Sequence, residues 1–189
     1  MPFGTDKTYG TILADPPWSF RSWSDKGKNR APDCLIRQKG LAERHYKTMS
    51  LDDIEALPVQ TLARRDCVLI MWVVDCMIPE ALAVGSAWGF KYKTTAFTWT
   101  KTTKSGAPAV GLGYWGRGQT EQAFLFTRGS PRRLSAGVRK LIVSPRREHS
   151  QKPDEQYERI EALCAGPYVE LFARQRRPGW DAWGDQLGE

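Results

Sequence analysis

The residues best suited to chemistry stand near the N-terminus, in the stretch DPPW at positions 15–18. Asp15 offers a carboxylate oxygen as a hydrogen-bond acceptor, and the carbonyl of Pro16 offers a second acceptor. Because successive prolines lock their φ angles, the direction of that carbonyl is fixed. Trp18 offers a ring on which a planar base can stack. Two acceptors beside an aromatic ring are suited to orienting an amine carried by a base.

Orientation matters for the exocyclic amine of adenine, because its lone pair is delocalised into the ring and is a poor nucleophile. Acceptors that hold the amine hydrogens direct the lone pair at an electrophile, and no covalent enzyme intermediate is then required. The alternative is that DPPW is only a turn after a strand, since Asp-Pro is common in turns. The aromatic residue directly after the prolines favours the site.

The charge of the chain favours polyanionic partners, with a net charge of +7 and a pI near 9.4. Much of the positive charge falls between positions 128 and 147. This stretch is either a solvated surface or a phosphate-binding one, and the eight tryptophans favour nucleic acid because aromatic rings beside cations stack on bases. The stretch contains Arg128, Arg132, Arg133, Arg139, Lys140, Arg146 and Arg147.

The elements that must position DPPW alternate between apolar strands and helices. This alternation predicts an α/β sandwich with a mostly parallel sheet, in which ligands bind outside the carboxyl ends of strands. DPPW directly follows the first predicted strand and therefore lies at that edge. Strands are predicted over 8–14, 67–74, 93–100, 121–127 and 168–174, helices over 51–58, 79–90 and 152–164, and long loops over 19–48 and 101–119.

Several classes of protein are disfavoured by the same sequence. A length of 189 residues fits one domain over 1–189. The chain has no apolar run long enough to cross a membrane and no signal-peptide pattern, so we expect a cytoplasmic protein. Four cysteines without a C-x-x-C pair and two histidines predict no metal, with Cys67 and Cys164 as buried free thiols. A zinc deaminase would need H-x-E and P-C-x-x-C elements, and neither occurs.

Blocks along nearly the whole chain carry a family resemblance. DPPW is followed by HYKTM, GYWGRGQTEQAFLFTRGSP, EHSQKPDEQYERIEAL and ELFARQRRPGWDAWGDQL. This order resembles the adenine-N6 methyltransferases related to the catalytic subunit of the eukaryotic messenger-RNA adenosine methyltransferase, and the compact size is similar to bacterial and bacteriophage members. The resemblance implies a Rossmann-like fold that uses S-adenosylmethionine, with the catalytic motif N-terminal to the main cofactor-binding segment.

The resemblance also implies roles for individual residues. The cofactor contacts rest on it alone, because no G-x-G-x-x-G follows a strand and Gly179 and Gly184 are the nearest candidates. Asp185 stands where some relatives have asparagine. The implied catalytic residues are Asp15, Pro16, Pro17 and Trp18; the cofactor-binding residues are Asp15, Lys152, Glu170, Phe172, Arg174, Asp185 and Gln186; the residues near the target base are Tyr46, Trp115 and Glu121.

Each of these residues also has a structural interpretation. Lys152 is alternatively an ordinary residue at a helix N-terminus, although a cation there opposes the helix dipole. Phe172 is alternatively a core residue, Glu121 a cap of the glycine-rich loop, and Arg174 part of a basic surface.

The leading functional hypothesis is methylation of adenine N6 in DNA by a monomer or a homodimer. The same chemistry on RNA is an alternative, because both substrates are polyanions and positive charge does not separate them. A second alternative is a non-catalytic subunit that only binds nucleic acid. A degraded catalytic motif would be expected in such a subunit, whereas DPPW is intact here.

Overall fold

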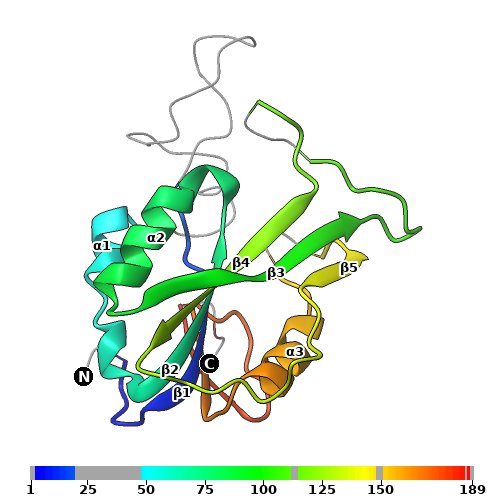
Figure 1. Ribbon diagram of the computed structural model, residues 1–189. Coiled ribbons are helices and arrows are strands. Elements are labelled where there is room, and N and C mark those ends of the chain that lie inside the picture. The colour runs from blue at the N-terminus through cyan, green and yellow to red at the C-terminus, as the bar shows by residue number, and fades with distance from the viewer. Residues whose placement is uncertain (1–2, 20–47, 112–114, 148–150, 186, 188–189) are drawn as a thin grey trace.

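The computed structural model describes residues 3–19, 48–111, 115–147, 151–185 and 187. In this part of the chain, seven strands form one sheet in the order β5-β3-β4-β2-β1-β6-β7 (Figure 1). The strands are β1 (Tyr9–Ala14), β2 (Ala63–Val73), β3 (Lys91–Thr102), β4 (Thr120–Arg128), β5 (Leu141–Pro145), β6 (Tyr168–Leu171) and β7 (Trp180–Trp183). The α-helices are α1 (Leu51–Glu55), α2 (Ile78–Ala87) and α3 (Glu155–Leu163), and short 3₁₀ turns η2 (Val59–Thr61) and η3 (Asp75–Met77) flank β2.

The sheet is mostly parallel, as predicted. β1 pairs in parallel with β2 and β6, β6 with β7, and β3 with β5, whereas β4 is antiparallel to both β2 and β3. The reversal of β4 brings its first residues to the edge where the other described strands end. From β1 the chain leads to β2 on one side and later to β6 on the other, so the end of β1 is a topological switch point.

Two hydrophobic cores lie on opposite faces of the sheet, because successive side chains of a strand point to opposite faces. On β1, Ile12 and Ala14 face the core covered by α1 and α2, whereas Leu13 faces the core covered by α3. Ser50 caps α1 by accepting a hydrogen bond from the backbone N–H of Asp53 at 3.1 Å, as its sequence predicts. The three layers hold the inner strand β1, and with it DPPW, in a fixed position.

The boundaries of the predicted elements differ from the prediction by up to four residues, and two strands show this best. β2 begins at Ala63, four residues before the predicted start. β6 ends at Leu171 and not at position 174, because Phe172 adopts a φ of 62°, in the left-handed region where a strand cannot continue. The short strands β5 and β7 were absent from the prediction.

The buried cysteines agree with the prediction. Cys67 and Cys164 are buried free thiols, and burial raises the pKa of Cys67 to about 12 and that of Cys164 to about 11. Of the predicted loop over 19–48, only Ser19 and Thr48 belong to the described residues. Among the helices that the structure describes, none is long and apolar enough to cross a membrane.

Candidate active site at the carboxyl end of the sheet

Asp15 lies directly after β1, at the switch point of the sheet, and its carboxylate is held by a lysine from another layer. The Asp15 Oδ2 atom is 2.9 Å from the Nζ atom of Lys152, which precedes α3. The same Nζ atom is 3.2 Å from Oε2 of Glu121, near the start of β4. The structure therefore brings together Asp15, Lys152 and Glu121. The sequence predicted them separately, as a catalytic residue, a cofactor-binding residue and a residue near the target base.

A fourth residue, Lys101, extends this cluster. It lies near the end of β3 and forms an ion pair with Glu121, while its ammonium group stands 5.3 Å from the centre of the Trp99 ring. The charges thus alternate along the row Lys101, Glu121, Lys152, Asp15. Lys101 is not among the site residues predicted from the sequence, although its place directly after a predicted strand is the signal that marks the ligand-binding edge of such sheets.

The electrostatics of the row follow from its partial burial. Burial raises the pKa of Asp15, and the Lys152 ammonium opposes this effect. Burial by itself would raise the pKa of Glu121 and lower that of Lys152. Their opposite charges outweigh it, so the Glu121 pKa is lowered and the Lys152 pKa is raised. Opposite charge thus favours the charged forms of Glu121 and Lys152, and the side chains of Lys152 and Asp15 are only 10% and 20% exposed.

The structure corrects the expected role of Trp18. Its side chain is 3% exposed in the core beneath α1 and α2, and its indole N–H donates to the carbonyl of Trp72 at 3.1 Å. A ring buried in this way presents no face to an incoming base, so stacking on the base is wrong for Trp18 in this structure. Trp18 instead anchors the end of DPPW to β2.

Trp72, which holds Trp18, also contacts residues in and before α3. The Trp72 indole N–H donates to Oε1 of the buried Gln156 at 2.7 Å, and the Lys152 ammonium lies 5.6 Å from the centre of the Trp72 ring. Trp72 therefore contacts both the residue that anchors DPPW and the lysine that holds Asp15. Neither Trp72 nor Gln156 was singled out from the sequence, since both read as ordinary members of a strand and a helix.

The backbone of the two prolines is fixed by hydrogen bonds. The carbonyl of Pro16 accepts from the backbone N–H of Trp18 at 2.8 Å, and that of Pro17 accepts from Met49 at 3.1 Å. A carbonyl oxygen has two lone pairs, so Pro16 retains capacity for a second donor. Pro16 and Asp15 thus provide two acceptors at adjacent positions.

Residues expected to face the cofactor line the next strand end. Tyr157 donates a hydrogen bond to Oε2 of Glu170 at 2.9 Å, and burial raises the pKa of Glu170 to about 7. Arg174 is close enough for its charge to lower the pKa of Asp15. The ring of Phe172 meets the edge of Trp183 at 5.4 Å, so Phe172 is partly a packing residue.

The remaining predicted residues are less well connected. Asp185 is exposed beyond β7. Trp115 is 90% exposed with a φ of 69°, and no described contact joins it to the row of charges. Tyr46 and Gln186 lie outside the described residues.

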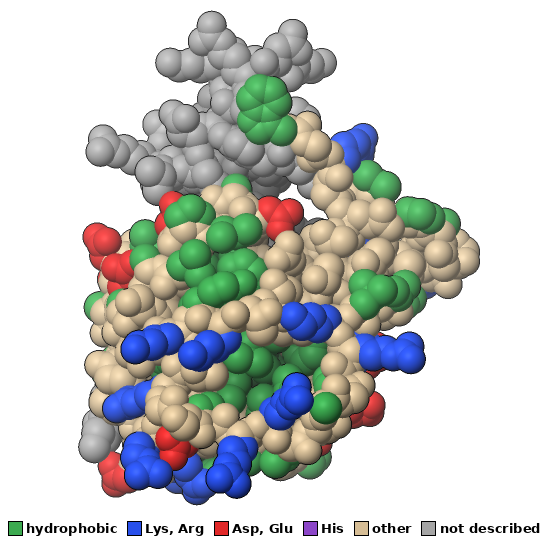
Figure 2. Space-filling model, in the orientation of Figure 1, with side chains coloured by type: hydrophobic (Ala, Val, Ile, Leu, Met, Phe, Trp, Pro, Cys, Tyr) green, Lys and Arg blue, Asp and Glu red, His purple; other side chains and the backbone are tan. Residues whose placement is uncertain are grey.

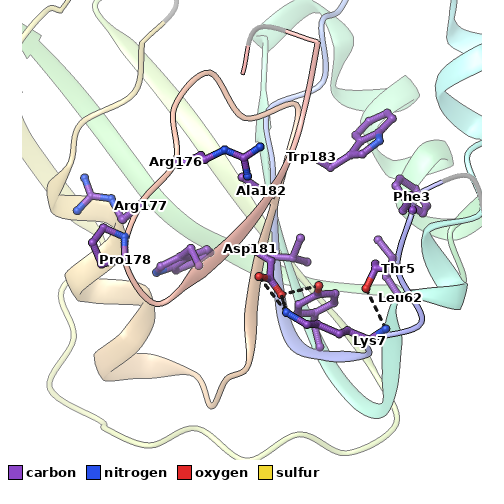
Figure 3. Close-up of a pocket in the computed structure, with 14 residues that line it drawn as sticks. Phe3, Thr5, Lys7, Leu62, Arg176, Arg177, Pro178, Asp181, Ala182 and Trp183 are labelled. Carbon is purple, nitrogen blue, oxygen red and sulfur yellow. Dashed lines mark hydrogen bonds and ion pairs between the residues drawn. The ribbon is translucent and has the colours of Figure 1, made fainter. Parts of the chain in front are cut away.

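A separate cavity of about 590 Å³ runs along β7 and the N-terminal segment. Figure 3 shows Trp183 toward its upper end and the ion pair of Lys7 with Asp181 toward its lower end, where Nζ and Oδ2 are 2.9 Å apart. None of the predicted catalytic or cofactor-binding residues that the structure describes lines this cavity. The charged row at the end of β1 is therefore the better candidate for the active site.

Comparison with known proteins supports the resemblance seen in the sequence. The chain matches the MT-A70 family over residues 9–186. It is 32% identical to the Type II methyltransferase M.MunI of Mycoplasma sp, covering 96% of this chain and 78% of that protein.

Two further relatives are longer than this chain. It is 29% identical to the N6-methyladenosine RNA methyltransferase MTA1 of Cryphonectria parasitica, over 95% of this chain and 52% of that one. It is 30% identical to the N(6)-adenine-specific methyltransferase METTL4 of Homo sapiens, over 96% of this chain and 38% of that one. The resemblance and the enzyme class it implied are confirmed, and the chain belongs to the MT-A70 family of methyltransferases.

Proposed function

We propose that the protein transfers a methyl group from S-adenosylmethionine to N6 of adenine in DNA. The observation that carries this proposal is the Asp15 carboxyl group at the end of β1, held by Lys152 beside the fixed carbonyl of Pro16. DNA is favoured over RNA because the chain covers most of a type II methyltransferase but only about half of the RNA methyltransferase.

The two acceptors would work by orienting the amine. If Asp15 and Pro16 each hold one hydrogen of the adenine amine, the nitrogen lone pair is directed away from them, toward the methyl donor. These acceptors are already held in place by Lys152 and Trp18, so little reorganisation accompanies the reaction.

After methyl transfer the amine nitrogen must also release one proton. The nitrogen gains the methyl carbon and a positive charge, and it returns to neutrality by losing one of its hydrogens. The Asp15 carboxylate would already hold such a hydrogen. Because burial raises its pKa, Asp15 is a better acceptor for that proton than an ordinary surface carboxylate.

The charged groups at the strand ends suit S-adenosylmethionine, which supplies an activated methyl group on a positively charged sulfur. Its amino-acid end carries both an ammonium and a carboxylate group. Asp15 and Glu170 provide carboxyl groups, and Lys152 and Arg174 provide cations, so this donor set fits both ends of that zwitterion. Phe172, which turns the chain after β6 with its φ of 62°, would border the same space.

Labelled S-adenosylmethionine offered with matched pools of DNA and RNA tests the proposal. We expect label in DNA, recovered as N6-methyl-2′-deoxyadenosine after digestion to nucleosides. Label in RNA alone would favour the RNA alternative, and no label in either pool would favour a non-catalytic subunit. The cytoplasmic location and the monomeric or homodimeric state expected from the sequence stay predictions.

A further inference from the structure

The positive charge of the chain is concentrated at the edge of the sheet opposite Asp15. This basic edge consists of the starts of β2 and β3 and the connection from β4 to β5, at residues 63–66, 91–94 and 128–140. Figure 2 shows the corresponding gathering of blue side chains over the lower half of the molecule. Its cations are Arg64, Arg65, Lys91, Lys93, Arg128, Arg132, Arg133, Arg139 and Lys140.

The basic edge accounts for the whole net charge. It holds nine of the 28 Lys and Arg residues and one of the 21 Asp and Glu residues, so its formal charge is +8. The rest of the chain, with 19 cations and 20 acids, carries −1. A surface that serves only solubility mixes both signs, and a large single-sign field is typical of a surface that binds an oppositely charged partner.

The cations of the basic edge have few carboxylate partners. Its single acid, Asp66, is 3.0 Å from Arg65 and also accepts the backbone N–H of Ser130 at 2.8 Å. Arg128 and Lys140 donate to neutral oxygens and so keep their charge uncompensated. Every cation of the edge is exposed except Arg128, which is half-buried.

Part of the basic edge is rigid. Lys91 and Lys93 flank Tyr92 on β3, and the Tyr92 ring packs edge-on against Phe124 and Phe126 with centroids 5.2 and 5.6 Å apart. These contacts hold the strand that carries both lysines, so binding an anion there costs less ordering than on a mobile loop.

The structure also places the two parts of the basic stretch 128–147, which is continuous in the sequence, at opposite edges of the sheet. Arg146 and Arg147 lie at the catalytic edge, where the backbone N–H of Arg146 donates to Thr102 at the end of β3. Arg132 and Arg133 lie at the opposite edge, in the connection whose Leu134 N–H donates to Leu163 at the end of α3. Arg128 follows Glu121 by seven residues along β4, which at about 3.3 Å per residue is roughly 23 Å.

We propose that the basic edge binds the sugar–phosphate backbone of nucleic acid outside the segment that presents the target adenine. The charge, exposure and fixed strand support a phosphate surface, and only the choice of DNA rests on the proposed function. A separation of roughly 23 Å corresponds to about seven base pairs of duplex at about 3.4 Å each. A duplex that reaches from Asp15 to the basic edge must therefore extend at least that far beyond the adenine.

The test measures how the affinity for mixed-sequence DNA duplexes depends on salt, with the full chain. We compare duplexes of 25 and 8 base pairs (about three and a half times and about once the required span) by fluorescence anisotropy. The edge variants are Lys91→Gln/Lys93→Gln and Arg132→Gln/Arg133→Gln. The matched control, Leu82→Glu/Ala83→Glu, changes the net charge by the same amount at exposed positions of α2, outside the basic edge.

We expect each edge variant to reduce the slope of log affinity against log salt by about 1 to 2 on the long duplex, since each phosphate contact contributes about 0.9. The control should leave the slope nearly unchanged, and the short duplex should show a smaller difference. An unchanged slope in the edge variants, or an equal fall in the control, would overturn the proposal. Methyl transfer assayed on the same proteins separates the two ideas, because a reduced slope without any methylation would sink only the proposed function.

Discussion

The two edges of the sheet carry charge in opposite ways. At the carboxyl end, Lys152 bridges Asp15 and Glu121, and its side chain is only 10% exposed. At the opposite edge, exposed cations such as Lys91 and Arg132 have no carboxylate partner among the described contacts. The same residue types are thus paired and half-buried in one region, and uncompensated in the other.

This difference separates two uses of charge. A partly buried ion pair gives little net stability, because desolvation consumes most of the attraction, but it fixes the position and protonation state of each group. Exposed cations without partners do not fix the positions of neighbouring groups, but they attract a polyanion from a distance. We therefore expect single substitutions to affect rate at the carboxyl end and affinity at the basic edge.

The largest effect should come from Lys152→Met, which leaves Asp15 and Glu121 without their shared cation. We expect methyl transfer to fall by at least ~100-fold, the scale for losing one preorganised interaction. We also expect destabilisation by about 3 kcal/mol, the lower end for breaking a buried pair. Single-turnover kinetics and urea unfolding measure the two quantities. Lys104→Met, at an exposed lysine, is the control, and equal losses in both variants would contradict the assignment.

A smaller effect should distinguish Lys101→Gln from Lys93→Gln, two identical changes at opposite ends of β3. Removal of Lys101 leaves Lys152 as the only cation that the described contacts pair with Glu121. We expect kcat to fall by ~10-fold, the scale for one charged hydrogen bond, with little change in the salt dependence of binding. Removal of Lys93 should leave kcat at saturating DNA unchanged and weaken the salt dependence. Steady-state kinetics at several salt concentrations give kcat and the salt dependence of binding. Identical changes in the two variants would contradict the proposed difference between the two edges of the sheet.

The smallest effect concerns the pH dependence of stability at Glu170. Burial raises its pKa from 4.5 to about 7 in the folded protein, so the folded state retains the proton over a wider range. The associated stability is fully present below pH 4.5 and is lost as the pH rises through about 7. Glu170→Gln should remove this loss, so thermal unfolding of the variant should vary less with pH than that of the parent. Parallel curves over this range would show that Glu170 does not titrate as described.

The strong sequence signals predicted much of the fold. The run CVLIMWVV, apart from its last residue Val74, lies within a strand buried on both faces, and Ser50 with its following acids caps a helix. β5 and β7 are four or five residues long and carry mixed patterns, which local periodicity cannot separate from loops. The end of β6 depends on the backbone of Phe172, which its side chain does not predict.

The sequence predicted individual residues of the site but not the contacts that join them. Asp15 stands out because an acid and two prolines follow an apolar strand, whereas the row through Lys152, Glu121 and Lys101 depends on contacts between distant segments. Trp18 shows the limit most clearly, since a tryptophan directly after Asp-Pro-Pro suits either stacking on a base or packing in a core. Its burial and the hydrogen bond from its indole to Trp72 assign it to the core.

The central claim is that the Asp15 carboxylate orients the amine that is methylated, and Asp15→Asn tests it most directly. The variant keeps the shape of the side chain but replaces one acceptor oxygen with a donor that would face the amine hydrogens. We measure single-turnover methyl transfer at saturating cofactor and nucleic acid, with thermal unfolding to confirm that the protein is folded. We expect a loss of at least ~100-fold in rate. A folded Asp15→Asn protein that methylates at nearly the parent rate would contradict it.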